Sequence, residues 1–232
     1  MDMAANGKKP PSKLLLALEM RGIWELQAFF ALYPLLRRAP RGDGHPVLVL
    51  PGLSASDAST RPLRMYLKAQ GYAAHGWKLG PNRGPRPGVE DAMDARLAEL
   101  ADRYQRKVSL IGWSLGGVFA RELAKRHPDI VAKVITMGSP FSGTPYANNA
   151  WRIYQLITGH SVEQPPIEAR LSLKPPVETV ALWSPRDGIV HPRAARGVAG
   201  ERDREVALRC THMGFAYDPQ VIAAVLRELE SE

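Results

Sequence analysis

From His45 onward, short runs rich in Val, Ile and Leu alternate with longer stretches of helical periodicity. Runs of this kind are typical of buried strands, and the stretches between them are typical of helices that connect parallel strands. The pattern predicts an α/β fold in which a mainly parallel sheet has helices on both faces. We expect strands near 47–50, 72–78, 108–112, 131–137, 177–183 and 205–210, and helices near 60–70, 89–106, 113–126 and 219–230.

The composition agrees with one folded domain. The chain has 232 residues, of which 45% are hydrophobic and 23% are charged. These proportions are typical of globular proteins and exclude collagen-like repeats and disulfide scaffolds. The only cysteine, Cys210, has no partner for an internal disulfide, which favours a reducing, cytoplasmic location. The formal charge of +8 gives a mild attraction for anionic surfaces, but it does not identify a binding partner.

The stretch 14–38 is strongly apolar and predicts an N-terminal helix, although Glu19, Arg21 and Glu25 interrupt it. A membrane span is unfavourable, because the apolar side chains contribute about −5 kcal/mol whereas three central charges cost about 9 kcal/mol. The uncharged run 14–18 is also shorter than a signal peptide requires.

Three segments therefore organise the chain: a disordered polar lead over residues 1–13, the apolar helix over 14–38, and the α/β domain over 39–232. We expect the apolar helix to pack on the domain or against a second copy of the chain in a homodimer. The alternative is a peripheral contact with a membrane through Leu14–Leu36, assisted by the arginines that follow it.

A candidate nucleophile stands between the strand near 108–112 and the helix after it. The segment Gly112–Gly117 matches the pattern G-x-S-x-G, with Ser114 at its centre. Glycines two residues to either side let the strand and the helix approach each other while the serine hydroxyl stands clear of the turn. The N-terminus of the following helix supplies backbone N–H groups and a positive dipole end, which suit an oxyanion. The alternative interpretation is an ordinary glycine-rich turn.

Together with three other segments, this motif resembles the α/β-hydrolase superfamily, and within it bacterial serine carboxylesterases and lipases. The resemblance extends from Pro46 to Glu230, and its most specific segments are 47–53, 112–117, 184–188 and 211–214. It implies an α/β-hydrolase fold with a short cap insertion. It also implies a catalytic serine, acid and histidine in that order along the chain.

The search for an acid and a base is thereby limited to residues after Ser114. His212 follows the last predicted strand, where the family places its histidine, and His191 is the alternative base. Asp187 lies in a turn after the strand near 177–183, at the sheet edge where catalytic groups of α/β proteins gather. The histidine would remove the serine proton, and the carboxylate would orient the imidazole. The alternative for Asp187 is a purely structural turn residue.

Two backbone N–H groups are candidates for the oxyanion hole. One belongs to Leu115, which follows the candidate nucleophile, and the other to Leu53, which follows Pro51-Gly52. Many members of the family carry His-Gly where this chain has Pro51-Gly52. Pro51 departs from that pattern, so the sequence leaves open how this loop is braced.

Residues 139–176, between the strands predicted near 131–137 and 177–183, form a longer connection than most. We predict that about 141–176 of this connection forms a cap. Its aromatic residues favour a short helix over 149–158 that covers an apolar site. The alternative is a surface loop that only covers an edge of the sheet. The predicted substrate contacts are Trp113, Trp151, Met213 and Phe215.

The sequence predicts a hydrolase of carboxylic esters with short to medium acyl chains, acting on a small-molecule or lipid ester. A lipase for long-chain acylglycerols, a thioesterase or an acyltransferase would use the same three residues. A rival of another class is a catalytically silent binding protein with a hydrolase fold. No cofactor and no metal are expected, since the loop 80–85 lacks the ending of a phosphate loop and no His or Cys spacing fits a metal. No nucleic acid is expected, because the basic stretch 193–204 lacks interleaved aromatics.

Overall fold

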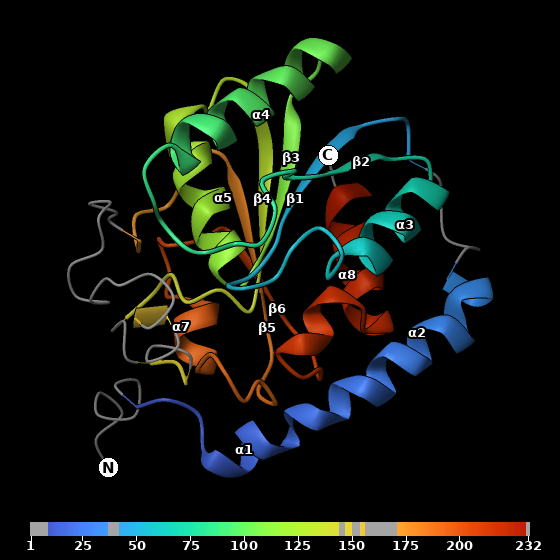
Figure 1. The fold of residues 1–232 in the computed structure, drawn as a ribbon, viewed down its shortest axis with the longest axis vertical. Helices are drawn as coiled ribbons and strands as arrows, with labels where there is room; N and C mark the ends of the chain where they lie inside the picture. Colours follow the sequence, from blue (N-terminus) through green and yellow to red (C-terminus); the bar gives the residue numbers. More distant parts are fainter. Residues whose placement is uncertain (1–8, 37–41, 144–146, 150–153, 156–170, 231–232) are drawn as a thin grey trace.

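The computed structural model describes residues 9–36, 42–143, 147–149, 154–155 and 171–230. Within these residues one sheet has the strand order β2-β1-β3-β4-β5-β6, and every neighbouring pair is parallel (Figure 1). The prediction of a mainly parallel sheet is confirmed. The strands are β1 (Pro46–Leu50), β2 (Ala73–Gly76), β3 (Val108–Trp113), β4 (Val131–Met137), β5 (Glu178–Trp183) and β6 (Arg204–Ala207).

Helices lie between these strands or follow the last of them, as the alternation predicts. The long ones are α3 (Arg61–Ala69), α4 (Val89–Tyr104), α5 (Leu115–Arg126) and α8 (Pro219–Glu230). Two short helices were not expected from the sequence, α7 (Pro192–Arg196) and the 3₁₀ helix η3 (Met213–Ala216). A helix of four or five residues is too short to show a periodic pattern of apolar residues.

Two predicted strands, over 72–78 and 205–210, are shorter in the structure, where β6 ends at Ala207. β2 ends at Gly76, because the N–H groups of Trp77 and Lys78 donate to the Asp57 carboxylate, each at 3.1 Å. Those two donors are therefore withdrawn from the sheet.

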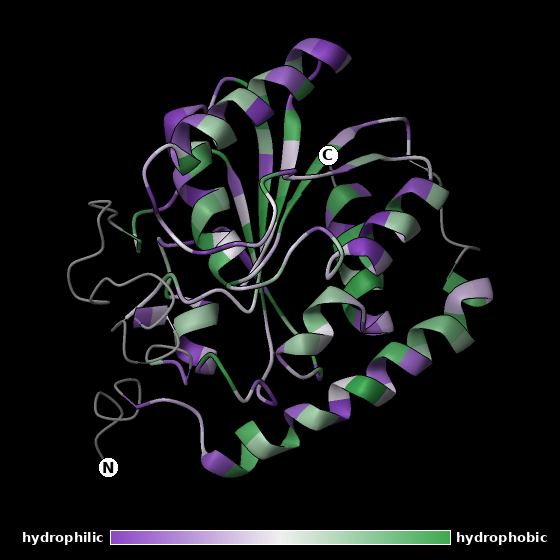
Figure 2. Ribbon diagram, viewed as in Figure 1, coloured by the Kyte–Doolittle hydropathy of each residue, from purple (hydrophilic) through white to green (hydrophobic). Residues whose placement is uncertain are grey.

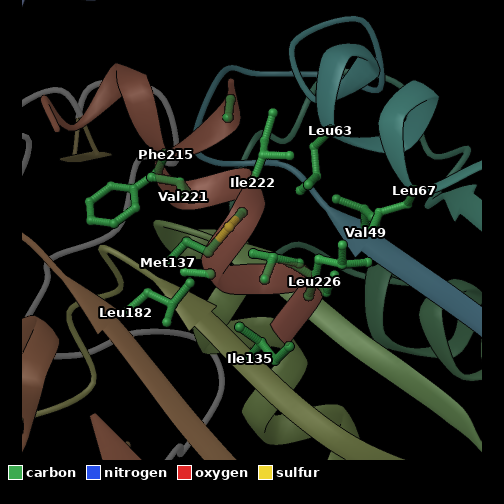
Figure 3. Close-up of a cluster of buried hydrophobic side chains, with 14 of the residues drawn as sticks. Val49, Leu63, Leu67, Ile135, Met137, Leu182, Phe215, Val221, Ile222 and Leu226 are labelled. Carbon is green, nitrogen blue, oxygen red and sulfur yellow. The ribbon is translucent and has the colours of Figure 1, made fainter. Parts of the chain in front are cut away.

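Apolar side chains on the two faces of the sheet form two separate clusters. Val47 and Val49 of β1 belong to the cluster that contains α3 and α8 residues, whereas Leu48 and Leu50 belong to the cluster with α4 and α5. This alternation follows from the two-residue period of a strand that is buried on both faces. Figure 2 shows the hydrophobic residues concentrated along the central strands. Figure 3 shows α8 side chains beside strand residues and the α3 leucines in the first cluster.

The apolar N-terminal stretch forms three consecutive helical pieces, α1 (Lys13–Ala17), η2 (Leu18–Arg21) and α2 (Gly22–Leu36) (Figure 1). α2 packs against α8 and η3 of the same chain. Phe29 is fully buried in the first cluster, whereas Trp24 and Phe30 on the same helix are exposed. Among the described residues, no helix combines the length and the apolar character that crossing a membrane would require.

Because the sheet is parallel, all its strands end at the same edge. The segments that follow β1, β3, β5 and β6 carry Leu53, Ser114, Asp187 and His212, respectively. The topology thus gathers the candidate site residues at one edge of the sheet.

Candidate active site

Ser114 occupies a sharp turn between β3 and α5. Its backbone has φ 54° and ψ −122°, a region that costs free energy for any residue except glycine. Close packing holds this turn: a Cβ atom at Gly112 would overlap the Gly117 backbone, and one at Gly116 would overlap the Leu50 carbonyl. The Ser114 N–H donates to the Met137 carbonyl at 2.8 Å. The conformation matches the turn that presents a nucleophilic serine above a parallel sheet.

Asp187 and His212 form a buried hydrogen-bonded pair. His212 Nδ1 lies 2.8 Å from Asp187 Oδ2, and the two residues are 4% and 1% exposed. The other carboxylate oxygen, Oδ1, accepts from the N–H groups of Ile189 and Val190, both at 2.8 Å. Because Nδ1 faces the carboxylate, Nε2 is the ring nitrogen left to exchange a proton with a serine.

Opposing effects act on the pKa of His212. Burial disfavours the charged imidazolium and lowers the pKa. The Asp187 charge and its hydrogen bond act in the opposite direction, and the charge of Glu19 adds to them. The result is a pKa above the ordinary value of 6.5. The imidazole can act as a base only above this pKa, so activity that depends on it would fall as the pH drops through it.

Hydrogen bonds connect the loop that bears His212 to its neighbours. The indole Nε1 of Trp113, the residue before Ser114, donates to the His212 carbonyl at 3.0 Å, and the two ring centroids are 6.0 Å apart. On the other side, Ser184 Oγ donates to the Cys210 carbonyl at 2.6 Å. The end of β3 and the segment after β5 are therefore both bonded to the segment after β6 at the sheet edge.

The segment after β1 lies against Ser114. A Cβ atom placed on Gly52 would be 3.2 Å from Ser114 Cβ, so the backbone that leads into Leu53 passes beside the candidate nucleophile. Leu115 is the first residue of α5, and the N–H groups of a first helical turn have no partner within the helix. Leu53 and Leu115 are both half-buried. This placement agrees with the oxyanion role predicted for both, which remains a prediction.

Asn82 braces the segment after β1, and sequence reasoning missed it. The side chain is fully buried, and its Nδ2 donates to the Pro51 carbonyl at 2.8 Å. Its backbone N–H donates to the Ala55 carbonyl at 2.8 Å, and its carbonyl accepts from the Ser54 N–H at 2.7 Å. Asn82 thus supplies the support that the sequence left open at Pro51, which departs from the His-Gly pattern. An asparagine in a loop rich in glycine and proline gives no sequence signal of such burial.

The predicted substrate contacts differ in their placement. Met213 is 44% exposed. Trp113 and Phe215 are buried in the core, where Phe215 approaches the His212 ring edge-on with centroids 6.2 Å apart. The structure thus gives these two aromatic residues a packing role beside His212 and does not bring them to an open surface. Trp151 lies outside the described residues, as does most of the predicted cap helix over 149–158.

The alternative base, His191, has another role in the structure. It caps α7, and its Nδ1 accepts from the Arg193 N–H at 3.3 Å. Burial, together with the charge of Arg193, lowers its pKa. His45, His75 and His127 contact Ser109, Tyr104 and Asp94, and His160 lies outside the described residues. Within the part of the chain that the structure describes, no group of three or more His, Cys, Asp and Glu side chains could hold a metal ion.

Comparisons with known proteins agree with this geometry. A family model described as alpha/beta hydrolase fold matches residues 80–158, which include β3, Ser114 and α5. The chain is 37% identical over 78 residues to pimeloyl-(acyl-carrier protein) methyl ester esterase of Aromatoleum aromaticum, a match that covers 34% of this chain and 28% of the esterase. It is 29% identical over 113 residues to a triacylglycerol lipase of Pseudarthrobacter phenanthrenivorans, covering 45% of this chain and 35% of the lipase. The matches therefore span about a third of the length of these relatives.

Solved structures extend the likeness over most of the chain. A pyrethroid hydrolase from Sphingobium faniae superposes with a TM-score of 0.57 at 16% identity, covering 81% of this chain and 98% of that one. At this level of identity the likeness shows a shared fold.

Proposed function

We propose that this chain, which has the α/β-hydrolase fold, hydrolyses carboxylic esters through an acyl-enzyme formed on Ser114. The observation that carries the proposal is the buried hydrogen bond between Asp187 and His212, at the sheet edge where Ser114 occupies its strained turn. The named activities of the relatives, a methyl ester esterase and a triacylglycerol lipase, point to the same bond type.

The proposed reaction assigns one role to each side chain. His212 Nε2 accepts the Ser114 hydroxyl proton while the serine oxygen attacks the ester carbonyl carbon. The developing oxyanion accepts hydrogen bonds from the N–H groups of Leu53 and Leu115. His212 then gives its proton to the departing alcohol, which leaves an acyl-Ser114. In the second half, His212 deprotonates a water molecule that attacks this acyl group and then returns the proton to Ser114.

Asp187 acts through His212 in every step. Its carboxylate holds Nδ1–H, which fixes the imidazole tautomer and stabilises the imidazolium formed when the serine proton is accepted. The two N–H groups on Oδ1 fix the carboxylate itself. We propose short- to medium-chain esters as substrates. A lipase for long-chain acylglycerols, a thioesterase or an acyltransferase is the alternative with the same side chains.

A fluorophosphonate probe tests the proposal directly, because it reacts only with an activated serine. We expect the folded protein to be labelled at Ser114, as located by mass spectrometry of the digested protein. Ser114→Ala is expected to remove the label, and His212→Gln is expected to slow labelling strongly. Absence of label on folded wild-type protein would instead favour the catalytically silent binding protein.

A further inference from the structure

The N-terminal segment, residues 9–36, has one carboxylate that contacts both loops that carry the proposed acid and base. Glu19 of η2 accepts through Oε1 from the His212 N–H at 2.9 Å and from the Gly188 N–H at 2.7 Å. Its Oε2 accepts from the Met213 N–H at 3.2 Å. Gly188 directly follows Asp187. A single side chain therefore bridges the backbone next to Asp187 and the backbone of His212.

A second carboxylate anchors the His212 loop from the same segment. Glu25 of α2 accepts from the Thr211 N–H at 2.8 Å and from the Thr211 hydroxyl at 2.5 Å. Thr211 Oγ1 in turn accepts from the Gly214 N–H at 3.0 Å. Glu25 thus holds the residue before His212, whereas Glu19 bonds to the backbone of both loops.

The backbone of the N-terminal segment also packs on the Asp187 loop. A Cβ atom on Gly188 would overlap the Leu15 carbonyl, so the two backbones are in direct contact. Asn149 Nδ2 donates to the Pro11 carbonyl at 3.1 Å and to the Gly188 carbonyl at 2.6 Å. The contact with Glu19 is therefore part of a continuous surface between the segment and the loop.

The chemistry of this arrangement explains why the residue is acidic. Three N–H donors converge on one half-buried group, and an ionised carboxylate accepts such bonds about twice as strongly as a neutral oxygen does. Its negative charge also lies near the imidazole that becomes positively charged when the serine proton is accepted. The same side chain therefore acts on the position of His212 and on its charge.

We propose that Glu19 is a positioning residue of the active site, which fixes the Asp187 and His212 loops relative to each other and stabilises the imidazolium form of His212. Its catalytic consequence rests on the proposed ester hydrolysis. Its structural and electrostatic consequences do not.

The groups around His212 define the expected pH effect. Asp187 and Glu19 are the charged groups that raise its pKa, and the uncharged rings of Trp113 and Phe215 flank the imidazole. Other titratable groups of the surrounding elements include Glu25 of α2 and Cys210, Tyr217 and Asp218 between β6 and α8. The same elements also carry the charged side chains of Arg21, Arg186 and Arg209. Since Glu19 raises the pKa of His212, removal of its charge lowers that pKa and moves the acidic limb of the activity profile to lower pH.

The central variant is Glu19→Gln, which keeps the size of the side chain, removes its charge and loses one acceptor oxygen. We expect kcat to fall by about 10- to 100-fold, as for small displacements of catalytic groups, with little change in KM. The acidic limb of kcat/KM moves to lower pH. Gln27→Ala, an exposed position on the same segment, is the matched control and keeps the wild-type profile.

A second measurement needs no substrate. The imidazole of His212 is titrated by NMR and assigned by the signal that disappears in His212→Gln. In Glu19→Gln we expect a lower pKa than in the wild type. Glu19→Asp keeps the charge but draws it back by one methylene, so the pKa stays close to the wild-type value while kcat falls. Phe29 and Glu25 still hold the segment on the domain, so these variants are expected to fold.

The outcomes separate the two proposals. An unlabelled wild-type Ser114 would remove the ester hydrolase, whereas the NMR titration of Glu19→Gln would still test Glu19. An unchanged His212 pKa in Glu19→Gln, or wild-type kcat in both Glu19 variants of an active enzyme, would overturn the role proposed for Glu19.

Discussion

Hydrogen bonds to both carboxylate oxygens fix Asp187 in the orientation that the proposed chemistry requires. Both of its oxygens are engaged, one by two backbone N–H groups and the other by His212, so the carboxylate has one orientation available. The sequence predicted Asp187 and His212 because each follows a strand in the chain order that the family resemblance implies. It did not predict Asn82, since its role depends on contacts with a segment about 30 residues earlier in the chain.

A residue-scale prediction concerns Asn82. Asn82→Ala leaves the Pro51 carbonyl and the Gly84 N–H without this partner, and burial of unsatisfied groups costs about 1 to 3 kcal/mol each. We expect the segment that carries Leu53 to loosen, and kcat to fall more than KM changes. Arg83→Ala, at the exposed neighbouring position, is the control. Steady-state kinetics on the two purified variants give the comparison, and equal kcat values would contradict the bracing role.

At the scale of elements, the N-terminal segment combines two opposite surfaces. Its inner side carries Phe29, Glu19 and Glu25 against the domain, whereas Trp24 is 70% and Phe30 is 61% exposed. The sequence showed acidic residues only as interruptions of an apolar stretch, because periodicity does not reveal which side of a helix meets the protein. The homodimer and the peripheral membrane contact predicted for Leu14–Leu36 both stay predictions.

An element-scale prediction compares the two neighbouring phenylalanines of α2. Phe29→Ala removes a fully buried ring and is expected to lower the free energy of unfolding by about 3 to 5 kcal/mol. Phe30→Ala removes an exposed ring and is expected to change it by less than about 0.5 kcal/mol. Denaturant unfolding followed by circular dichroism measures both. If the two variants are equally stable, α2 is not packed on the domain as described.

At the scale of the whole molecule, the parallel sheet decides where the site lies. It brings the ends of β1, β3, β5 and β6 to one edge, although the residues they carry are far apart along the chain. The cap predicted over about 141–176 lies mostly outside the described residues, so its part in substrate selection stays a prediction.

The prediction at this scale concerns acyl-chain length. If an apolar site binds the acyl group, each buried methylene contributes about 0.8 kcal/mol until the site is filled. We therefore expect kcat/KM on p-nitrophenyl esters to rise with chain length, reach a maximum at short to medium chains and then fall. Ser114→Ala supplies the background rate. A flat profile from acetyl to palmitoyl would exclude a capped apolar site, and a maximum at palmitoyl would favour the lipase.

The sequence by itself determined the elements and the motif, because strand and helix periods and a strand-turn-helix serine motif are local patterns of neighbouring residues. Only the tertiary structure decided which distant groups meet. Glu19 contacts Gly188 and His212, which lie 169 and 193 positions later in the chain. Glu25 contacts Thr211, which lies 186 positions later. A hydrogen bond requires atoms within about 3 Å of each other, and packing of the whole fold sets that distance.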